Sequence, residues 1–148
     1  MRTVLQRVSR AEVRISGRVV GAIRKGFVVL LGVGRGDTED DAAFLVDRTV
    51  GLRVFADHQD KMNLALKAAG GELLVISQFT LFADLSGGRR PSFLDAAPPD
   101  DARRLYEHFV SLARDSGVKV ETGEFGAMMQ VDLVNDGPVT IMLDSKSR

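Results

Sequence analysis

The chain has 148 residues, which is enough for one domain with a sizeable apolar core. Apolar residues make up 45% and charged residues 27%, as in soluble globular proteins, and 20 acidic residues balance 20 basic ones. A zero net charge argues against a protein that coats DNA or RNA, since such proteins carry a basic excess. The absence of cysteine excludes disulfides, thiolate metal sites and a cysteine nucleophile.

No apolar run approaches the length of a membrane span, and the N-terminal residues lack a signal-peptide pattern. We therefore expect a cytoplasmic protein that does not bind membranes. There is no internal repeat, low-complexity segment or linker, so residues 1–148 are predicted to form a single domain.

The first third of the chain predicts short strands. Residues 3–8 and 11–15 are predicted as separate strands, the second because its apolar and polar residues alternate with the period of a half-buried strand. Ser16-Gly17 is a turn signal, after which residues 18–23 return as a hairpin strand. Residues 27–31 are apolar throughout, as expected of a central strand. The pattern predicts an antiparallel meander.

A helix is predicted to follow, ending near Gly51. Thr38 and Asp41 have the spacing of a helix start, and the first turn is acidic, which suits the N-terminus of a helix. Two more strands are predicted after this helix, at residues 52–55 and 72–79.

The longest irregular segment, residues 84–99, precedes a second predicted helix. Irregular loops of this length are often functional. Prolines at 98 and 99 suit a helix entry, and Gly117 suits a helix end. Further strands are predicted at residues 118–121, 130–134 and 139–143. The predicted class is α+β, with a sheet partly covered by two helices.

The stretch from Ser77 to Thr80 is the first candidate site. It follows the apolar run 73–76 and places two hydroxyls and a carboxamide where the strand emerges from the core. Side chains held there by a rigid scaffold can face a cleft, which suits binding. A purely structural role stays open, because threonine is common in strands and glutamine can satisfy backbone groups. The pattern predicts a pocket without naming a reaction.

Other patterns give weaker hypotheses. The glycine loop at residues 32–36 lacks the spacing of a dinucleotide or Walker phosphate loop. His58 and His108 stand in different elements, so no metal site is expected. Met128-Met129 is interpreted as core filling rather than pocket lining. Arg89-Arg90 fits a phosphate contact and a solvated surface equally well.

Several motifs of the chain, taken together, match those of a known protein family. The chain resembles the D-aminoacyl-tRNA deacylases, which free tRNA from wrongly attached D-amino acids, and the resemblance runs from Met1 to Ser145. It rests most on Ser-Gln-Phe-Thr-Leu at residues 77–81 and on Asn-Asp-Gly-Pro-Val-Thr at residues 135–140. It implies a largely antiparallel, barrel-like sheet covered by two main helices.

The resemblance also implies a homodimer with the active site at the subunit interface. The Gly137-Pro138 dipeptide would be cis, with carbonyls that reach into the partner's pocket, and Arg7 would hold this turn in place. Phe79 would meet the terminal adenosine of the aminoacyl-tRNA, and no cofactor or metal is implied. The implied catalytic residues are Thr80, Ser77, Gln78 and Phe79. The implied residues of chiral selection are Gly137, Pro138, Arg7, Leu81 and Asn135. The zero net charge suggests that tRNA contacts are local, with Arg89 and Arg90 as candidates.

A rigid turn explains how such a pocket would tell enantiomers apart. Two enantiomers are equally hydrophobic, so only geometry separates them. Fixed carbonyls can accept hydrogen bonds from the substrate's α-ammonium when its side chain points away, while the mirror image drives its side chain into them. Such a pocket accepts many D-residues and also glycine.

The expected chemistry is ester hydrolysis. Thr80 could be a nucleophile, but the pocket motifs contain no histidine or cysteine to activate it. We favour substrate positioning and oxyanion stabilisation by backbone N–H groups near Phe79 and Thr80, assisted by the neighbouring ribose hydroxyl.

Two alternatives stay open. An editing domain of the same fold could remove a wrong L-amino acid, or a non-catalytic dimer could bind the tRNA end. The Gly137-Pro138 element argues against the first, and the intact pocket motifs argue against the second.

Overall fold

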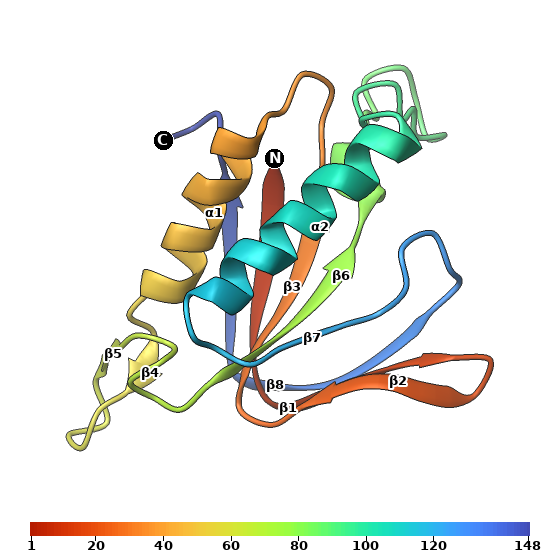
Figure 1. Ribbon diagram of the computed structural model, residues 1–148. Coiled ribbons are helices and arrows are strands. Elements are labelled where there is room, and N and C mark those ends of the chain that lie inside the picture. The colour runs from red at the N-terminus through yellow and green to blue at the C-terminus, as the bar shows by residue number, and fades with distance from the viewer.

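The computed structural model describes residues 1–148 and shows two helices packed side by side on one face of a strongly bent sheet (Figure 1). The elements in chain order are β1 (Arg2–Ile15), β2 (Arg18–Ile23), β3 (Gly26–Gly32), α1 (Glu39–Gly51), β4 (Phe55–Ala56), β5 (Met62–Leu64), β6 (Glu72–Ser77), the 3-10 turn η1 (Phe79–Phe82), α2 (Pro99–Asp115), β7 (Val120–Thr122) and β8 (Gln130–Asp144). The predicted α+β class, with a barrel-like sheet and two main helices, is confirmed. Neither helix is long and apolar enough to cross a membrane.

Strand β1 is the central strand of the sheet and pairs with other strands along both of its edges. One of its edges pairs antiparallel with β3 as far as Val8 and then with β2, while its other edge pairs with β8. The prediction of two separate strands at residues 3–8 and 11–15 is therefore wrong. Strand β8 pairs with both halves of β1, and the pairing has two irregularities, one at Arg7 and one at Ser9, which bend β1 without ending it.

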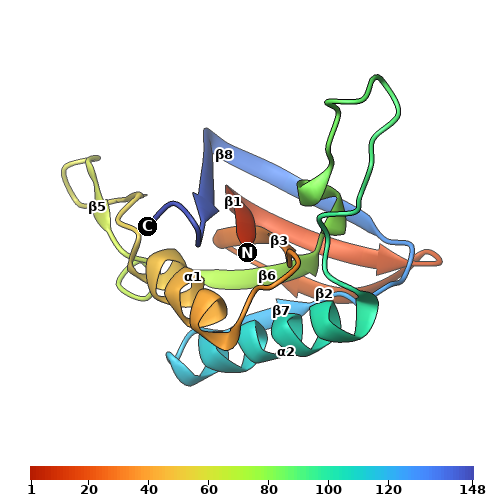
Figure 2. The same ribbon diagram turned by 90° about the horizontal axis from the view of Figure 1, so that it is seen from above.

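The sheet is mixed. The first three strands are antiparallel as predicted, but they do not form the predicted meander, because β3 pairs with β1 and not with β2. Strand β8 is also antiparallel to β1, whereas β6 runs parallel to β3 and β7 runs parallel to β6. The parallel pairs arise because α1 and α2 each cross one face of the sheet before the chain returns. Figure 2 shows both helices together on that side of the strands.

Several predicted boundaries differ from the observed ones. The strand predicted at residues 52–55 is reduced to the two residues of β4. The strand predicted at residues 72–79 ends at Ser77, because the chain tightens into η1. The strands predicted on either side of Gly137-Pro138 are one strand, β8, because both halves pair with β1. The helix start is confirmed by a capping box between Thr38 and Asp41.

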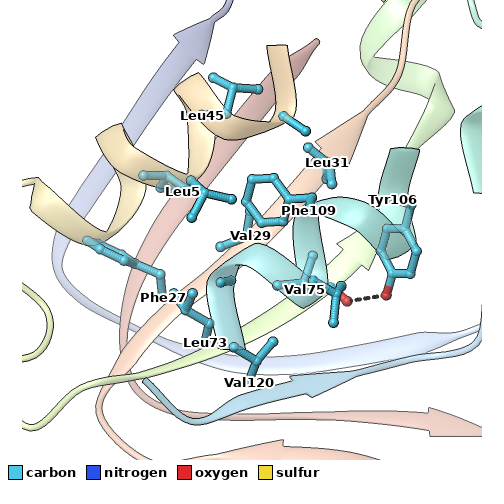
Figure 3. Close-up of a cluster of buried hydrophobic side chains, with 14 of the residues drawn as sticks. Leu5, Phe27, Val29, Leu31, Leu45, Leu73, Val75, Tyr106, Phe109 and Val120 are labelled. Carbon is cyan, nitrogen blue, oxygen red and sulfur yellow. Dashed lines mark hydrogen bonds between the residues drawn. The ribbon is translucent and has the colours of Figure 1, made fainter. Parts of the chain in front are cut away.

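Both faces of the central strands are buried, which explains their unbroken apolar runs. Alternate side chains of β3 and β6, such as Val29 and Val75, pack under the helices against Phe109 (Figure 3). The intervening side chains, such as Val28 and Leu74, belong to a smaller cluster inside the bend of the sheet. Helix α2 buries one apolar face against these strands, formed by Ala102, Leu105, Tyr106, Phe109 and Ala113.

The Tyr106 hydroxyl donates a 2.8 Å hydrogen bond to the carbonyl oxygen of Val75 (Figure 3). Burial raises the pKa of Tyr106 to about 12, so the phenol keeps its proton at neutral pH. We expect Tyr106→Phe to lower the free energy of unfolding by about 1 kcal/mol, since one buried hydrogen bond is lost. Urea unfolding measures this change, and an unchanged midpoint would show that the bond adds no stability.

Candidate functional site

The end of β6 forms the polar rim of a pocket. Its apolar residues 73–76 are buried, and the N–H of Gln78 donates to the carbonyl of Leu31 at 2.8 Å, which keeps the chain against β3 after the strand ends. The following turn exposes Phe79 and Thr80. The side-chain amide of Gln78 donates a hydrogen bond to the Thr80 hydroxyl oxygen, so two of the predicted side chains meet here.

A hollow of about 810 Å³ opens beside this rim. Its walls come from the glycine loop after β3, the end of β6 and the start of η1, the segment before α2, the first turn of α2 and the chain entering β8; the residues are 33, 35, 76–79, 93, 96–99, 102, 125–129 and 131. The rings of Phe79 and Phe93 meet edge to face, with centroids 5.0 Å apart. Of the 18 lining residues 12 are hydrophobic, so the pocket suits a flat, weakly polar ligand such as a nucleobase.

Met128 and Met129 both line this pocket. Met129 packs against the smaller apolar cluster, as predicted, but it also lines the pocket, which the prediction had set aside. The same prediction is wrong for Met128, whose side chain is 91% exposed. Adjacent residues entering a strand point to opposite faces, so only one of the pair can turn inward.

The Gly137-Pro138 turn interrupts the pairing of β8 with β1. Residues 136–139 loop out opposite Arg7, whereas Asn135 stays paired with Val8. The Gly137-Pro138 peptide bond is cis, as the resemblance implied. The turn therefore projects from the ladder as a short loop whose two ends are fixed by strand pairing.

The Arg7 side chain ties this loop to the rest of the molecule. Its Nε donates a 3.0 Å hydrogen bond to the carbonyl of Asp136, and one Nη donates to the carbonyl of Val54. The Arg7 side chain is only 13% exposed. Gly137 has a φ of +126°, and a Cβ added there would lie 2.9 Å from Arg7 Nη2. Both the backbone conformation and the close guanidinium favour glycine at this position.

The two candidate features do not meet within one chain. Ser77 pairs with Leu31 of β3, and Leu31 pairs with Thr3 of β1, so Ser77 lies at the level of Thr3. The Gly137-Pro138 turn lies at the level of Arg7. Four residues along β1 therefore separate Ser77 from the turn, a distance of about 13 Å. They also lie on opposite sides of β1, separated by about 14 Å across the sheet. One group therefore holds Ser77, Gln78, Phe79, Thr80 and Leu81, and the other holds Arg7, Asn135, Gly137 and Pro138.

The loop between η1 and α2 projects from the sheet (Figure 2). Its later residues, Phe93 and 96–98, line the pocket. Asp84 and Ser92 exchange backbone hydrogen bonds of 2.8 and 2.9 Å, which close the base of its outer part. Hydrogen bonds from the N–H and hydroxyl of Ser86 lower the pKa of Asp84. Arg89 and Arg90 lie beyond this base; they are exposed and do not line the pocket.

The histidines lie away from the pocket. His108 stands 4.0 Å from Glu39 on the helical layer, and His58 belongs to the segment between β4 and β5. No three acidic or histidine side chains gather in a metal-binding arrangement. Three wall residues, Arg35, Phe93 and Phe125, were not predicted as site residues. Phe93 ends an Arg-Pro-Ser-Phe sequence and Phe125 begins a Phe-Gly-Ala sequence, and these short motifs could have identified both residues. Arg35 has no comparable local signal.

These features define an α+β protein with a largely apolar, nucleoside-sized pocket at the end of a buried strand. Residues 4–144 match the family model described as D-Tyr-tRNA(Tyr) deacylase. The D-aminoacyl-tRNA deacylase of Thermotoga petrophila is 57% identical over 145 residues, which cover 98% of this chain and 97% of the relative. This chain belongs to the D-Tyr-tRNA(Tyr) deacylase family, which confirms the resemblance of its motifs.

Two solved structures share this fold. The c-Myc DNA unwinding element binding protein superposes with a TM-score of 0.92 at 38% identity, over 97% of this chain and 98% of that chain. A "probable eukaryotic D-amino acid tRNA deacylase" superposes with a TM-score of 0.82 over 96% of this chain and 97% of that chain. Its identity is 17%, so this second likeness concerns the fold alone.

Proposed function

We propose that this chain hydrolyses the ester bond of D-aminoacyl-tRNA and releases the D-amino acid and free tRNA. The match over nearly its whole length to relatives named D-aminoacyl-tRNA deacylase carries this conclusion. The chain is accordingly a hydrolase of chiral proofreading in translation, and we extend its substrates to mischarged glycyl-tRNA. As a single deacylase domain over residues 1–148, it would act on aminoacyl-tRNA in the cytoplasm.

We further propose that the active site is completed by a second copy of the chain. The support is the separation of the two groups, since a pocket built from Ser77 to Leu81 and Gly137-Pro138 needs both. Strand β8, which carries the turn, also exposes apolar side chains, with Leu133 37% and Met142 78% exposed. Burial of such side chains between two copies would stabilise a homodimer.

In this homodimer the turn selects the enantiomer. The carbonyls of Gly137 and Pro138 would accept hydrogen bonds from the α-ammonium of the substrate held in the partner's pocket. An L-residue in the same pose would direct its side chain into these carbonyls, whereas glycine has no side chain to exclude. Arg7 would fix the carbonyls in position, and Asn135 and Leu81 would border the pocket from the two chains.

The reaction needs a water molecule to attack the ester carbonyl and the tRNA hydroxyl to leave with a proton. Thr80 is hydrogen-bonded to Gln78, and no histidine lines the pocket. We therefore assign positioning to the Thr80 and Gln78 side chains, and oxyanion stabilisation to the N–H groups of Phe79 and Thr80. The ribose 2′-hydroxyl of the substrate would assist the attack.

A comparison of matched D- and L-tyrosyl-tRNA tests the activity. We expect rapid release of D-tyrosine and little release of L-tyrosine, because the turn excludes the L side chain. Preference for the L-ester would favour an L-aminoacyl editing domain. No release of D-tyrosine at micromolar enzyme would favour a non-catalytic protein that binds the tRNA end.

The role of Thr80 is tested by Thr80→Val on normal tRNA and by the wild type on D-tyrosyl-tRNA that ends in 2′-deoxyadenosine. We expect the variant to keep measurable turnover and the deoxy substrate to lose most of it. The opposite pattern, with Thr80→Val inactive but still binding tRNA, would identify Thr80 as the nucleophile.

A further inference from the structure

Arg35 is the only charged residue that lines the pocket at the end of β6. It lies in the glycine loop between β3 and α1, and its backbone N–H donates to the carbonyl of Asp95 at 2.9 Å. The neighbouring N–H of Ala97 donates to the carbonyl of Val33 at 2.9 Å. These bonds hold the glycine loop against the pocket wall, so the cation has a fixed attachment point.

The Arg35 side chain is oriented by one hydrogen bond and is otherwise unpaired. Its Nε donates to the carbonyl of Leu94. Its two Nη groups donate to no protein acceptor, and no carboxylate lies within ion-pair distance of them. Six other arginines do have a carboxylate within 4.0 Å; these are Arg2, Arg7, Arg14, Arg24, Arg104 and Arg148.

A guanidinium with both Nη groups unpaired presents two parallel N–H donors to an anion, and phosphate oxygens match this spacing. The wall of the pocket holds no acid that would repel such an anion. The remaining walls, including the Phe79–Phe93 pair, are suited to a base. The pocket therefore combines an apolar base site with one cation, which is the chemistry that recognises a nucleotide.

We propose that Arg35 binds the phosphate that links the terminal nucleoside of the tRNA to the preceding nucleotide. This rests on the proposed function and on the contact between the terminal adenosine and Phe79 that the family resemblance implies. A chain of zero net charge has no general attraction for RNA, so phosphates must be bound by individual cations such as this one.

The test uses two non-hydrolysable ligands, 3′-(D-tyrosylamino)-3′-deoxyadenosine with and without a 5′-phosphate, in calorimetric titrations. We expect the wild type to bind the phosphorylated ligand about tenfold or more tightly, as for a hydrogen bond between charged groups. Arg35→Ala should lose this preference and bind the unphosphorylated ligand as the wild type does. Arg35→Lys should keep part of the preference.

Arg104→Ala is the matched control. Arg104 lies near Arg35, since both residues line a small hollow next to the pocket. Arg104 does not line the pocket itself, and its guanidinium forms an ion pair with Glu39 at 3.4 Å. It should keep the full preference for the phosphorylated ligand. On D-tyrosyl-tRNA, Arg35→Ala should raise KM more than it changes kcat and should reduce the salt slope by about one.

Two results would overturn the assignment. Equal weakening of both ligands in Arg35→Ala would mean that Arg35 only holds the loop through Leu94. Equal affinity of the wild type for both ligands would mean that no phosphate is bound. A wild type that hydrolyses D-tyrosyl-tRNA but shows either result rejects the role of Arg35 alone, whereas a wild type without hydrolysis rejects the proposed function.

Discussion

Replacing Arg7 with alanine should reduce hydrolysis of D-tyrosyl-tRNA by about 100-fold, the effect expected when a site element moves by about 1 Å. Arg7 joins the carbonyl of Asp136 to that of Val54, so its loss frees residues 136–139, which no strand pairing holds. The carbonyls that should receive the substrate ammonium would then be mobile. The measurement is single-turnover release of labelled D-tyrosine.

Two variants make this result specific. Arg10→Ala removes a cation from the same strand at a side chain that makes no hydrogen bond or ion pair, and it should keep wild-type activity. Arg7→Lys keeps the charge but cannot reach both carbonyls with a planar fork, so it should be intermediate. A positioning role also predicts that hydrolysis of L-tyrosyl-tRNA rises relative to that of the D-ester. Wild-type rates and an unchanged ratio of D to L hydrolysis in Arg7→Ala would remove the turn from the mechanism.

The candidate site was predictable where its signal is local. The rim at Ser77 to Thr80 follows directly from a buried strand that ends in polar residues, and the structure places it beside a pocket. The anchoring of the turn has no local signal, because Arg7 and Asp136 are 129 residues apart in sequence. Only the resemblance supplied that partnership. Arg35 was missed because a single arginine in a glycine loop has no functional pattern in sequence. It becomes a site candidate only once the residues that line the pocket are known.

The fold shows the same division. Apolar periodicity located both helices and most strands, since burial on one or both faces is a local property of the pattern. Strand pairing is not local, so the continuity of β1 and β8 and the parallel neighbours of β6 could not be obtained from periodicity. The bulges that bend β1 contain polar residues. Polar residues also mark the ends of strands, so the pattern predicted two strands where the structure has one bent strand.

Replacing Asp41 with asparagine should lower the free energy of unfolding by about 2 kcal/mol at pH 7, the value expected when hydrogen bonds to a charged group are lost. The cationic partners Lys146 and Arg148 are 59% and 51% exposed, so the larger cost of breaking a fully buried ion pair does not apply. The Asp41 side chain is 4% exposed, and both of its oxygens lie 3.0 Å from Lys146 Nζ. Burial raises the pKa of Asp41, but hydrogen bonds from Ser145, Thr38 and Lys146 outweigh it and hold the pKa well below its usual range. Arg148 adds a further cation at 3.6 Å.

The sign of the pH dependence follows from this lowered pKa. A carboxyl that binds its proton less readily in the folded state stabilises the fold above its unfolded pKa of about 3.9 and loses that effect as the pH falls. Urea unfolding of the wild type and Asp41→Asn should therefore differ most at pH 7. The difference should begin to shrink as the pH falls below the unfolded pKa of about 3.9, and it should vanish only below the lowered pKa of the folded state. Asp40→Asn is the matched control, since Asp40 is exposed in the same helical turn and makes no ion pair. If the two variants lost equal stability, or if the deficit of Asp41→Asn did not change with pH, the ionised carboxyl would not be the source of the stability. The link from α1 to the C-terminal end of the chain would then rest on packing alone.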